Sequence, residues 1–530
     1  MGRNAGQQTV GGESAVSLIL SRLRIEHLWM LVPVVIVAWM AFMHPLRLLD
    51  FWWHLKVGEV ILTSGEIPRV DLFSFTRAGS PFIHQNWLGE VLYYLTYQMG
   101  GLPLLISLNA VLLLLAFAPI LHLCLEAGGG QRVSILCSFV AAIVLGFFGS
   151  MRPQSYSFVL FAWFYWILWA YRDRRRDYLW ALPLLMVVWV NLHGAFVLGL
   201  GMIALVLATE AVRRAVGGPR DDTLAPSALS KLALVLLVTV LASMANPEGY
   251  GVFAYVRQLQ VDPSSQQFVT EWQVPDVKEL AGILTFYGPF FMALLVFLYG
   301  RSRLNLTELG LFLAFSVFGL GARRNGIWFA LIVAPMVARH VSRPRVPNLA
   351  DKLHVESYLR TLVRRQEQWQ AGMRPNRYVL NWTILACLLL FTVMLSPWVR
   401  PNLKMKRLSS PLVDGGTPVG ALDYIEKHRL VGNIFHPQAY GDYLIWRLWP
   451  QQRSFVDGRV HLYDESLVRD YILVFQDDRW DSRLAKYDIE YLLLPKGDEN
   501  SKLIVEDARG STSWTLLYED NLSVLFEKQP

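Results

Sequence analysis

The segment Asp50-Phe51-Trp52-Trp53-His54 follows a long apolar run and opens a loop rich in acids, His and Trp. This loop continues through residues 67–71 and closes at residues 84–90, before a second apolar run begins. Loops between spans are usually short, and a long, strongly aromatic loop is typical of a functional segment. An acid beside a membrane core costs free energy unless it is solvated, paired or liganded. Asp50 is therefore the first candidate for a reactive group.

The composition indicates a polytopic membrane protein. The 530 residues are 54% hydrophobic and only 17% charged, whereas a soluble protein carries nearer ~25% charged residues. Residues 1–24 are polar and the first apolar run lacks a convincing cleavage site, so we expect no cleavable signal. The three cysteines lie in apolar runs and are expected to be packing residues. The net charge of +7 is spread over loop ends, which does not indicate a nucleic-acid partner.

Apolar runs along the chain predict about eleven transmembrane helices, because a span needs roughly 20 apolar residues. The short central runs fit that length least well. The runs cover residues 28–48, 102–124, 133–150, 155–171, 178–192, 195–211, 230–245, 281–299, 306–321, 326–338 and 378–398.

Arginines alternate along the loops in the way that sets membrane topology. The pattern predicts a plasma (inner) membrane protein with a cytoplasmic N-terminus, and places residues 50–90, 151–154, 246–276 and 321–326 on the outer face. Arg323 and Arg324 break this rule, which makes them candidates for a specific role. The arginines that follow the rule are Arg22, Arg24, Arg132, Arg172, Arg174, Arg175, Arg176, Arg213, Arg214, Arg301, Arg303, Arg339, Arg343 and Arg345.

The chain is predicted to have three parts. Residues 1–27 form a cytoplasmic segment, residues 28–400 a transmembrane domain, and residues 401–530 an extracytoplasmic α/β domain. The transmembrane domain includes an outer loop at 49–101 and a cytoplasmic surface helix at 346–376. In the last part, the patterns predict strands at 433–435, 453–456 and 489–494, a helix at 466–475, and a hairpin formed by 514–518 and 523–526.

Asp50 and His54 are one helical turn apart if the chain after Asp50 is helical. Asp50 could then bind a metal or accept a proton from an incoming nucleophile. The alternative is that Asp50 caps an interfacial helix and that the tryptophans form an aromatic belt. Both interpretations stay open on this segment alone.

Two further segments carry polar groups on the predicted outer face. Residues 269–275 contain Glu271, which alone would be an ordinary solvated loop acid. Residues 440–446 and 453–459 combine Tyr440, Asp442, Asp457 and Arg459, which alone would be a helix and a strand of an α/β fold. Together with the first loop they gather acids, arginines and aromatics at one membrane face.

In this order, the three segments resemble the GT-C superfamily of membrane glycosyltransferases, most closely the catalytic subunit of oligosaccharyltransferase. Residues 50–54 resemble the family's first-loop acid in its Asp-Pro-Trp-Phe-Asn-Tyr context. Residues 269–275 resemble its Ser-Val-Ser-Glu-His-Gln-Pro stretch with one extra residue. Residues 439–443 and 456–458 are similar to its Trp-Trp-Asp-Tyr-Gly and Val-Asp-Asn elements.

The resemblance implies an inverting transferase that moves a sugar or oligosaccharide from a polyprenyl-phosphate or pyrophosphate lipid to an acceptor glycan, lipid or protein. Asp50, Glu271 and His54 are the expected catalytic residues, and Asp50 with Glu271 would hold Mg²⁺ or Mn²⁺ if a metal binds. Arg323 and Arg324 would contact the donor's phosphate through guanidinium forks. The expected substrate-binding residues are Arg323, Arg324, Arg152, Trp53, Asp71, His84, Glu90, Tyr440, Asp442, Asp457 and Arg459.

The sequence also departs from the family. The loop at residues 149–154 has no acid where the family's metal-binding form has an acidic pair, which argues against a bound metal. The Trp-Trp-Asp element is only half present, so a peptide acceptor does not follow. A transporter or flippase is the alternative and predicts ionisable residues deep within spans. A non-enzymatic assembly protein is the third possibility.

Overall fold

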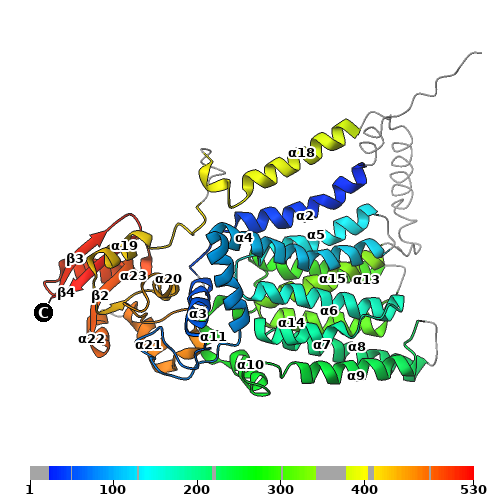
Figure 1. Cartoon of the computed structure of the whole chain (residues 1–530), viewed down its shortest axis with the longest axis horizontal. Helices are drawn as coiled ribbons and strands as arrows, with labels where there is room; N and C mark the ends of the chain where they lie inside the picture. Colours follow the sequence, from blue (N-terminus) through cyan, green and yellow to red (C-terminus); the bar gives the residue numbers. More distant parts are fainter. Residues whose placement is uncertain are drawn as a thin grey trace, which may run out of the picture.

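The computed structural model shows a bundle of apolar helices with a small α/β domain at one end (Figure 1). We call the end of the bundle that faces this domain the domain end. The structure describes residues 23–48, 50–127, 131–217, 222–299, 303–341, 378–403, 411–476 and 479–529. The predicted N-terminal segment, apart from residues 23–27, and the predicted surface helix at 346–376 lie outside these residues.

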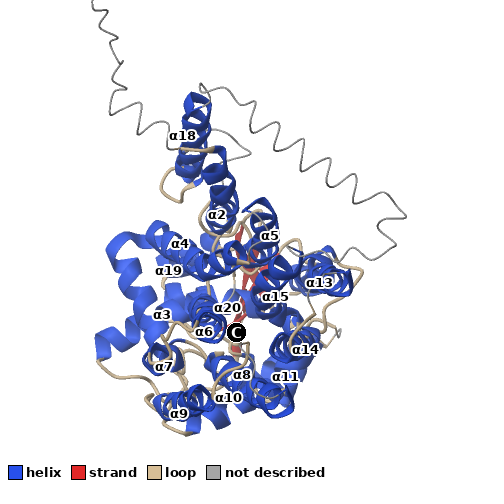
Figure 2. Cartoon of the chain, turned by 90° about the vertical axis from the view of Figure 1, so that its right-hand side faces the viewer, coloured by secondary structure: helices blue, strands red, loops and turns tan. Residues whose placement is uncertain are grey.

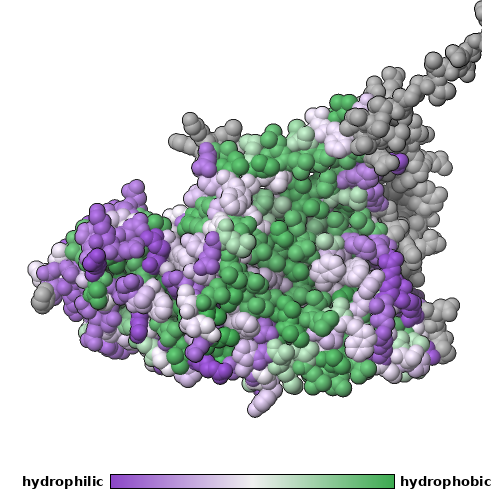
Figure 3. Space-filling view, viewed as in Figure 1, coloured by the Kyte–Doolittle hydropathy of each residue, from purple (hydrophilic) through white to green (hydrophobic). Residues whose placement is uncertain are grey.

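Each predicted apolar run carries a helix. Five helical stretches are long and apolar enough to cross a membrane among the described residues, so the predicted number of eleven spans stays a prediction. Figure 3 shows apolar side chains across the flank of the bundle and polar ones on the C-terminal domain. The five are α2 (Ile25–Met43), α4 (Trp87–Glu126), α8 (Phe196–Gly217), the stretch Leu280–Tyr299 and α18 (Tyr378–Leu395).

The remaining bundle helices are shorter or more buried. Two of them, α6 and α15, are buried over most of their length because they run through the middle of the bundle (Figure 2). The full set of these shorter or more buried helices is α5 (Gln131–Phe147), α6 (Gln154–Arg174), α7 (Ala181–Leu192), α9 (Pro226–Ala242), α14 (Leu306–Gly321) and α15 (Gly326–Val341).

A kink divides α4 into two helices with different surroundings. Gly100 and Gly101 leave helical geometry, and Gly101 adopts φ 60°, which glycine tolerates without a steric penalty. Pro103 stands two residues after Gly101, at the start of the apolar half of the helix. The kink therefore separates the predicted first loop from the next apolar run at the expected position.

The first loop (residues 49–101) is folded. It contains α3 (Phe51–Ser64), which ends at Gly65 in the left-handed conformation, a common helix stop. A turn then brings Val70 opposite Pro81. Trp53, Phe73 and Phe82 pack beneath this turn in a small core of their own. The loop is thus a rigid platform at the domain end.

The C-terminal domain holds one four-stranded sheet in the order β1-β2-β4-β3. β1 (Asn433–Phe435) pairs parallel with β2 (Ile489–Pro495), and β4 (Ser523–Lys528) pairs antiparallel with β2 and with β3 (Trp514–Glu519). The predicted strand at 453–456 is wrong: these residues make only an isolated bridge, between Ser454 and Ser74 of the first loop. The helices of the C-terminal domain are α19 (Val419–His428), α20 (Gln438–Leu448), α21 (Glu465–Val474), α22 (Trp480–Leu484) and α23 (Glu499–Gly510).

The domain packs against the first loop. Trp52, which is 1% exposed, makes an edge contact with Tyr443 of α20 at a ring-centroid distance of 4.8 Å. Short bridges also join Leu46 to Val413 and Ser74 to Ser454. The first loop therefore contacts the domain through the Trp52–Tyr443 ring pair and the Ser74–Ser454 bridge, and Leu46, just before the loop, adds a further bridge.

Candidate functional site

A cavity of about 960 Å³ opens at the domain end. Its walls come from the first loop, the turn before α6, the segment between α7 and α8, the helices at 251–272, the turn between α14 and α15, and the turn before residue 460 of the C-terminal domain. The residues that line it include Asp50, Trp53, His54, His84, Glu90, Arg152, His193, Glu271, Trp272, Arg324, Arg459 and His461. The three segments that the sequence singled out therefore meet in one place.

Asp50 stands at the start of α3, yet its side chain makes no capping hydrogen bond. The predicted capping role is therefore absent. The carboxylate is 38% exposed and faces the cavity, with Arg152 Nε 3.9 Å from its Oδ2. A methyl group built on Gly458 would lie 2.6 Å from Asp50 Oδ1, so the C-terminal domain approaches this acid through bare backbone.

Arg152 and Glu271 form a close pair beside Asp50. Arg152 Nη1 donates to both carboxylate oxygens of Glu271, at 2.7 and 2.6 Å. Burial alone would lower the pKa of Arg152, but the carboxylates of Asp50 and Glu271 outweigh it and raise the pKa. Glu271 is thus engaged through both oxygens, whereas Asp50 keeps a carboxylate open to the cavity.

The adjacent arginines 323 and 324 have different surroundings. Arg323 donates to the carboxylate of Glu279 at 2.5 and 3.0 Å, and it does not line the cavity. Arg324 does line it, with its guanidinium 4.7 Å above the ring of Trp272. Among the described residues no carboxylate pairs with Arg324, and burial lowers its pKa. Of the two candidates for phosphate binding, the structure brings only Arg324 to Asp50.

Histidines and a buried acid form the wall behind Asp50. Nδ1 of His54 lies 2.7 Å from Oε1 of Glu90, which is fully buried. His84 is nearby, 3.8 Å from Oε2 of the same acid. Burial is the largest single effect on the pKa of Glu90 and would raise it, but the hydrogen bond with His54 and the proximity of His84 together outweigh burial and lower the pKa. A proton on His54 Nδ1 would leave its Nε2 as an acceptor, so His54 and Glu90 form an oriented pair.

His193 also lines the cavity, and its imidazole is neutral. Burial and the nearby charge of Arg324 lower its pKa to about 3. The backbone N–H of Ala195 donates to His193 Nδ1 at 3.2 Å, and the Ser157 hydroxyl lies 2.9 Å from the same nitrogen. The proton therefore sits on Nε2, where it can serve as a hydrogen-bond donor.

Arg459 is held by carboxylates that do not line the cavity. It donates to Asp457 at 2.9 and 2.6 Å and to Asp71 at 2.6 Å, and all three side chains are fully or almost fully buried. Its guanidinium also lies 5.2 Å from the ring centre of Phe82. Buried charges need such complete pairing. Asp71 and Asp457 are thus placed to position Arg459, and buried Tyr440 does not line the cavity either.

Asp442 lies buried below the site. Its Oδ1 accepts a hydrogen bond from the N–H of Gly458 at 2.8 Å, and its Oδ2 would be 2.9 Å from a methyl group on that glycine. Asp50 and Asp442 therefore approach the same glycine. Burial, followed by the charges of Asp457 and Asp50, raises the pKa of Asp442 well above its usual value.

Sequence reasoning missed several cavity residues. Gly458 was not among the expected site residues, but its lack of a side chain lets two acids come close. The guanidinium of Arg324 lies over the ring of Trp272, and the ring of His461 stacks on that of Phe82 with a centroid distance of 5.3 Å. Nothing in their local sequence indicates these roles, because each depends on a contact between distant segments.

The acids expected to hold a divalent metal do not fit one. Mg²⁺ requires about six oxygen ligands in near-octahedral geometry. Asp50 and Glu271 instead share Arg152. Among the described residues, no group of three or more His, Cys, Asp or Glu side chains is close enough to hold a metal ion.

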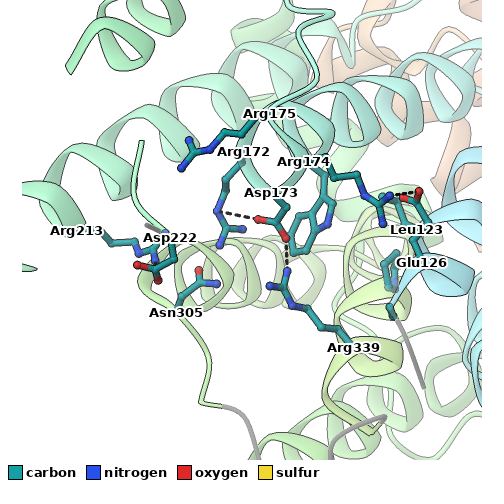
Figure 4. A pocket seen from close by; sticks show the side chains of 13 residues that line it. Leu123, Glu126, Arg172, Asp173, Arg174, Arg175, Arg213, Asp222, Asn305 and Arg339 are labelled. Atoms are coloured by element: carbon teal, nitrogen blue, oxygen red, sulfur yellow. Dashed lines mark hydrogen bonds and ion pairs between the residues drawn. The ribbon is translucent and has the colours of Figure 1, made fainter. Parts of the chain in front are cut away.

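A second cavity, of about 320 Å³, lies at the opposite end of the bundle (Figure 4). Arginines line it, and carboxylates lie beside them: Arg213 pairs with Asp222 at 2.6 Å, and Arg174 pairs with Glu126. Arg172 pairs with buried Glu210 at 2.8 Å. These three arginines are therefore paired with acids of the protein itself.

No known family model and no curated protein sequence matches this chain. Several solved structures do share its fold. Oligosaccharyltransferase AglB from Archaeoglobus fulgidus, in complex with an inhibitory peptide and a dolichol-phosphate, matches at 13% identity and TM-score 0.56, over 89% of this chain and 70% of that chain. ArnT from Cupriavidus metallidurans, bound to undecaprenyl phosphate, matches at 13% identity and TM-score 0.50, over 97% and 98%.

The arabinofuranosyltransferase AftD from Mycobacteria matches at 14% identity and TM-score 0.51, over 94% of this chain and 41% of that chain. All three are GT-C glycosyltransferases. The chain therefore has the GT-C fold, and with its apolar helices it is an integral membrane protein.

Proposed function

We propose that this protein, which has the fold of the GT-C glycosyltransferases, transfers a sugar from a polyprenyl-phosphate or pyrophosphate lipid to an acceptor. The observation that carries the proposal is the cavity at the domain end. There an open carboxylate, Asp50, and a guanidinium without a carboxylate partner among the described residues, Arg324, face one space. A base and a phosphate-binding cation are the two groups that this reaction needs.

The cavity also offers a route for a lipid tail. Val317, near the C-terminal end of α14, is 71% exposed on the flank of the bundle and still lines the cavity. Leu198, Leu259 and Phe318 line the same side. A polyprenyl chain in the bilayer could thus lie along α14 while its phosphate reaches Arg324. This arrangement agrees with the phosphate-linked lipids bound by AglB and ArnT.

The reaction follows from these positions. The acceptor oxygen attacks the anomeric carbon, and the bond from that carbon to the phosphate oxygen breaks. The electron pair leaves with the polyprenyl phosphate, which Arg324 stabilises, and the acceptor proton goes to Asp50. A single displacement of this kind inverts the anomeric configuration. The Nε2–H of His193 is placed to hold a sugar or phosphate oxygen.

His54 is the second candidate for the base. Glu90 orients its ring through Nδ1, which is the arrangement of an activated imidazole. Asp50 is the better candidate because it is more open to the cavity, whereas His54 is 4% exposed. The proposal therefore assigns proton transfer to Asp50 and acceptor positioning to His54 with Glu90.

We further propose that the N-terminus is cytoplasmic and that the cavity faces the outside, on the basis of the arginine pattern along the loops. The alternative, a transporter or flippase, predicts ionisable groups deep in the spans. The buried acids of the bundle, Glu210 and Glu308, lie near helix ends away from the cavity. We therefore favour the transferase.

Asp50→Asn tests the proposal. Asparagine keeps the size of the side chain, so insertion and folding are expected to survive. Transfer of a radiolabelled sugar from a polyprenyl-phosphate donor should fall by roughly two to four orders of magnitude, the usual worth of a positioned base. Binding of the donor lipid should persist. Wild-type turnover in Asp50→Asn would refute the assignment, and lipid translocation without transfer by the wild type would favour the flippase.

A further inference from the structure

The geometry points to Arg152 as a built-in cation: we propose that its guanidinium occupies the position and performs the charge-balancing role of a divalent metal, so that the site works without one. This inference rests on the proposed function for its catalytic consequence, but its structural part does not depend on turnover.

Arg152 contacts two of the acids that line the cavity, Asp50 and Glu271. It binds Glu271 through both oxygens, at 2.7 and 2.6 Å. Its Nε is 3.9 Å from Asp50 Oδ2 and has no hydrogen-bond partner, although it is buried. One side chain therefore bridges both carboxylates and keeps one N–H available at Asp50.

The backbone fixes Arg152 in this place. Its carbonyl accepts the N–H of Ser155 at 2.9 Å, which starts α6, and Pro153 follows it directly. The side chain is only 14% exposed. A cation that is already in position before the substrate binds costs no reorganisation during the reaction, which is the property that makes fixed charges effective in enzymes.

The charge balance supports the same role. Without Arg152, Asp50 and Glu271 would place two negative charges at the site where a phosphate must bind. With it, one carboxylate is neutralised through a two-oxygen contact and the other is partly neutralised. Arg324 then remains as the cation without a carboxylate partner in the described structure, available for the donor's phosphate.

A guanidinium differs from a metal in one respect that matters here. It offers a planar set of N–H donors and binds carboxylates from one side, whereas Mg²⁺ needs ligands all around. The turn lacks the acidic pair of the family's metal-binding form, and it carries Arg152. Arg152 thus stands in the turn that lacks acidic ligands, and its guanidinium supplies the positive charge that a metal would supply.

The first experiment measures metal binding by the purified full-length protein in detergent. Arg152→Asp adds a third carboxylate to Asp50 and Glu271, and we expect it to bind Mn²⁺, seen as loss of the free-ion signal in electron paramagnetic resonance. The wild type should bind none at the site. Mn²⁺ binding by the wild type that Asp50→Asn abolishes would overturn the proposal. If Arg152→Asp does not fold, Arg152→Gln takes its place in this experiment, and we expect Arg152→Gln to bind no Mn²⁺.

The second experiment measures transfer with a radiolabelled polyprenyl-phosphate sugar. Wild-type turnover should withstand a chelator, and Arg152→Gln should lose about 10²–10³-fold, as when one fixed electrostatic group is removed, without rescue by Mg²⁺ or Mn²⁺. The matched control is Arg447→Gln, because Arg447 also bridges two acids, Asp423 and Glu426, at 2.7 and 3.0 Å on the domain surface. Its turnover should stay at the wild-type level.

The outcomes separate the two ideas. Chelator-sensitive turnover restored by a divalent ion, or full turnover in Arg152→Gln, overturns the role of Arg152 and leaves the transferase in place. If the wild type transfers no sugar from any lipid-linked donor, the proposed function fails, and the Mn²⁺ measurements still decide whether Arg152 excludes a metal.

Discussion

Replacing Gly458 by alanine is the sharpest perturbation of the site, because it adds one methyl group and removes nothing. That methyl would stand 2.6 Å from Asp50 Oδ1 and 2.9 Å from Asp442 Oδ2. Ordinary contact begins near 3.4 Å, so the Asp50 carboxylate must retreat by about 0.8 Å. Asp442 is buried and held by the Gly458 N–H, so the more exposed Asp50 is the group that moves.

The size of the effect follows from this displacement. Moving a reacting group by about 1 Å can cost on the order of 10²-fold in rate, so Gly458→Ala should lose nearly that much transferase activity. Overpacking also costs roughly 1–3 kcal/mol of stability. Initial rates with a radiolabelled polyprenyl-phosphate sugar, together with thermal unfolding in detergent, measure both effects.

Gly415→Ala is the control. Gly415 belongs to the same domain, and a methyl group there would meet nothing within 4 Å. It should therefore keep both rate and stability. A folded Gly458→Ala protein that transfers sugar at the wild-type rate would show that Asp50 is not the reacting group, or that it is not held against this turn.

Other perturbations test separate parts of the structure. The pKa of Asp442 is raised in the folded state, so the contribution of Asp442 to stability is complete below the pKa of an unfolded aspartate and is lost as the pH rises through the raised pKa; Asp442→Asn keeps the acceptor for Gly458 and should lose less stability than the wild type over that rise in pH, measured by thermal unfolding. Trp52→Ala should cost about 3–5 kcal/mol and expose the domain contact to limited proteolysis. Arg324→Gln should weaken binding of polyprenyl phosphate in native mass spectrometry, whereas Arg323→Gln should not, since Glu279 already holds Arg323. A reporter active only in the cytoplasm should stay silent when it is fused to the C-terminus.

The helices and the first loop were predictable because they depend on local patterns. Apolar runs gave a helix at each expected place, and the position of Asp50 after such a run indicated a site before any contact was known. The predicted hairpin at the end of the chain is present as β3 and β4. These features follow from apolar periodicity, turn residues and the cost of placing an acid beside a membrane.

The internal arrangement of the site was not predictable in the same way. The sequence pattern at 453–456 predicts a strand, but the backbone of this segment bridges to Ser74 of the first loop. No local pattern reveals this long-range contact. Arg323 and Arg324 are equivalent by sequence, and only their tertiary contacts, with Glu279 and with Trp272 in the cavity, distinguish them. The sequence assigns Arg152 to substrate binding, whereas its contacts with Asp50 and Glu271 give it a different place in the site. Such distinctions arise from tertiary contacts.

The close approach of Gly458 to Asp50 has a consequence for the order of events on the ribosome. Gly458 is synthesised about 400 residues after Asp50. At about 5–20 residues per second, roughly 20 to 80 s separate the two. During that interval the nascent chain can enter the bilayer while the Asp50 carboxylate lacks the wall that completes the cavity. Under the proposed function, transfer therefore begins only after Gly458 has been synthesised.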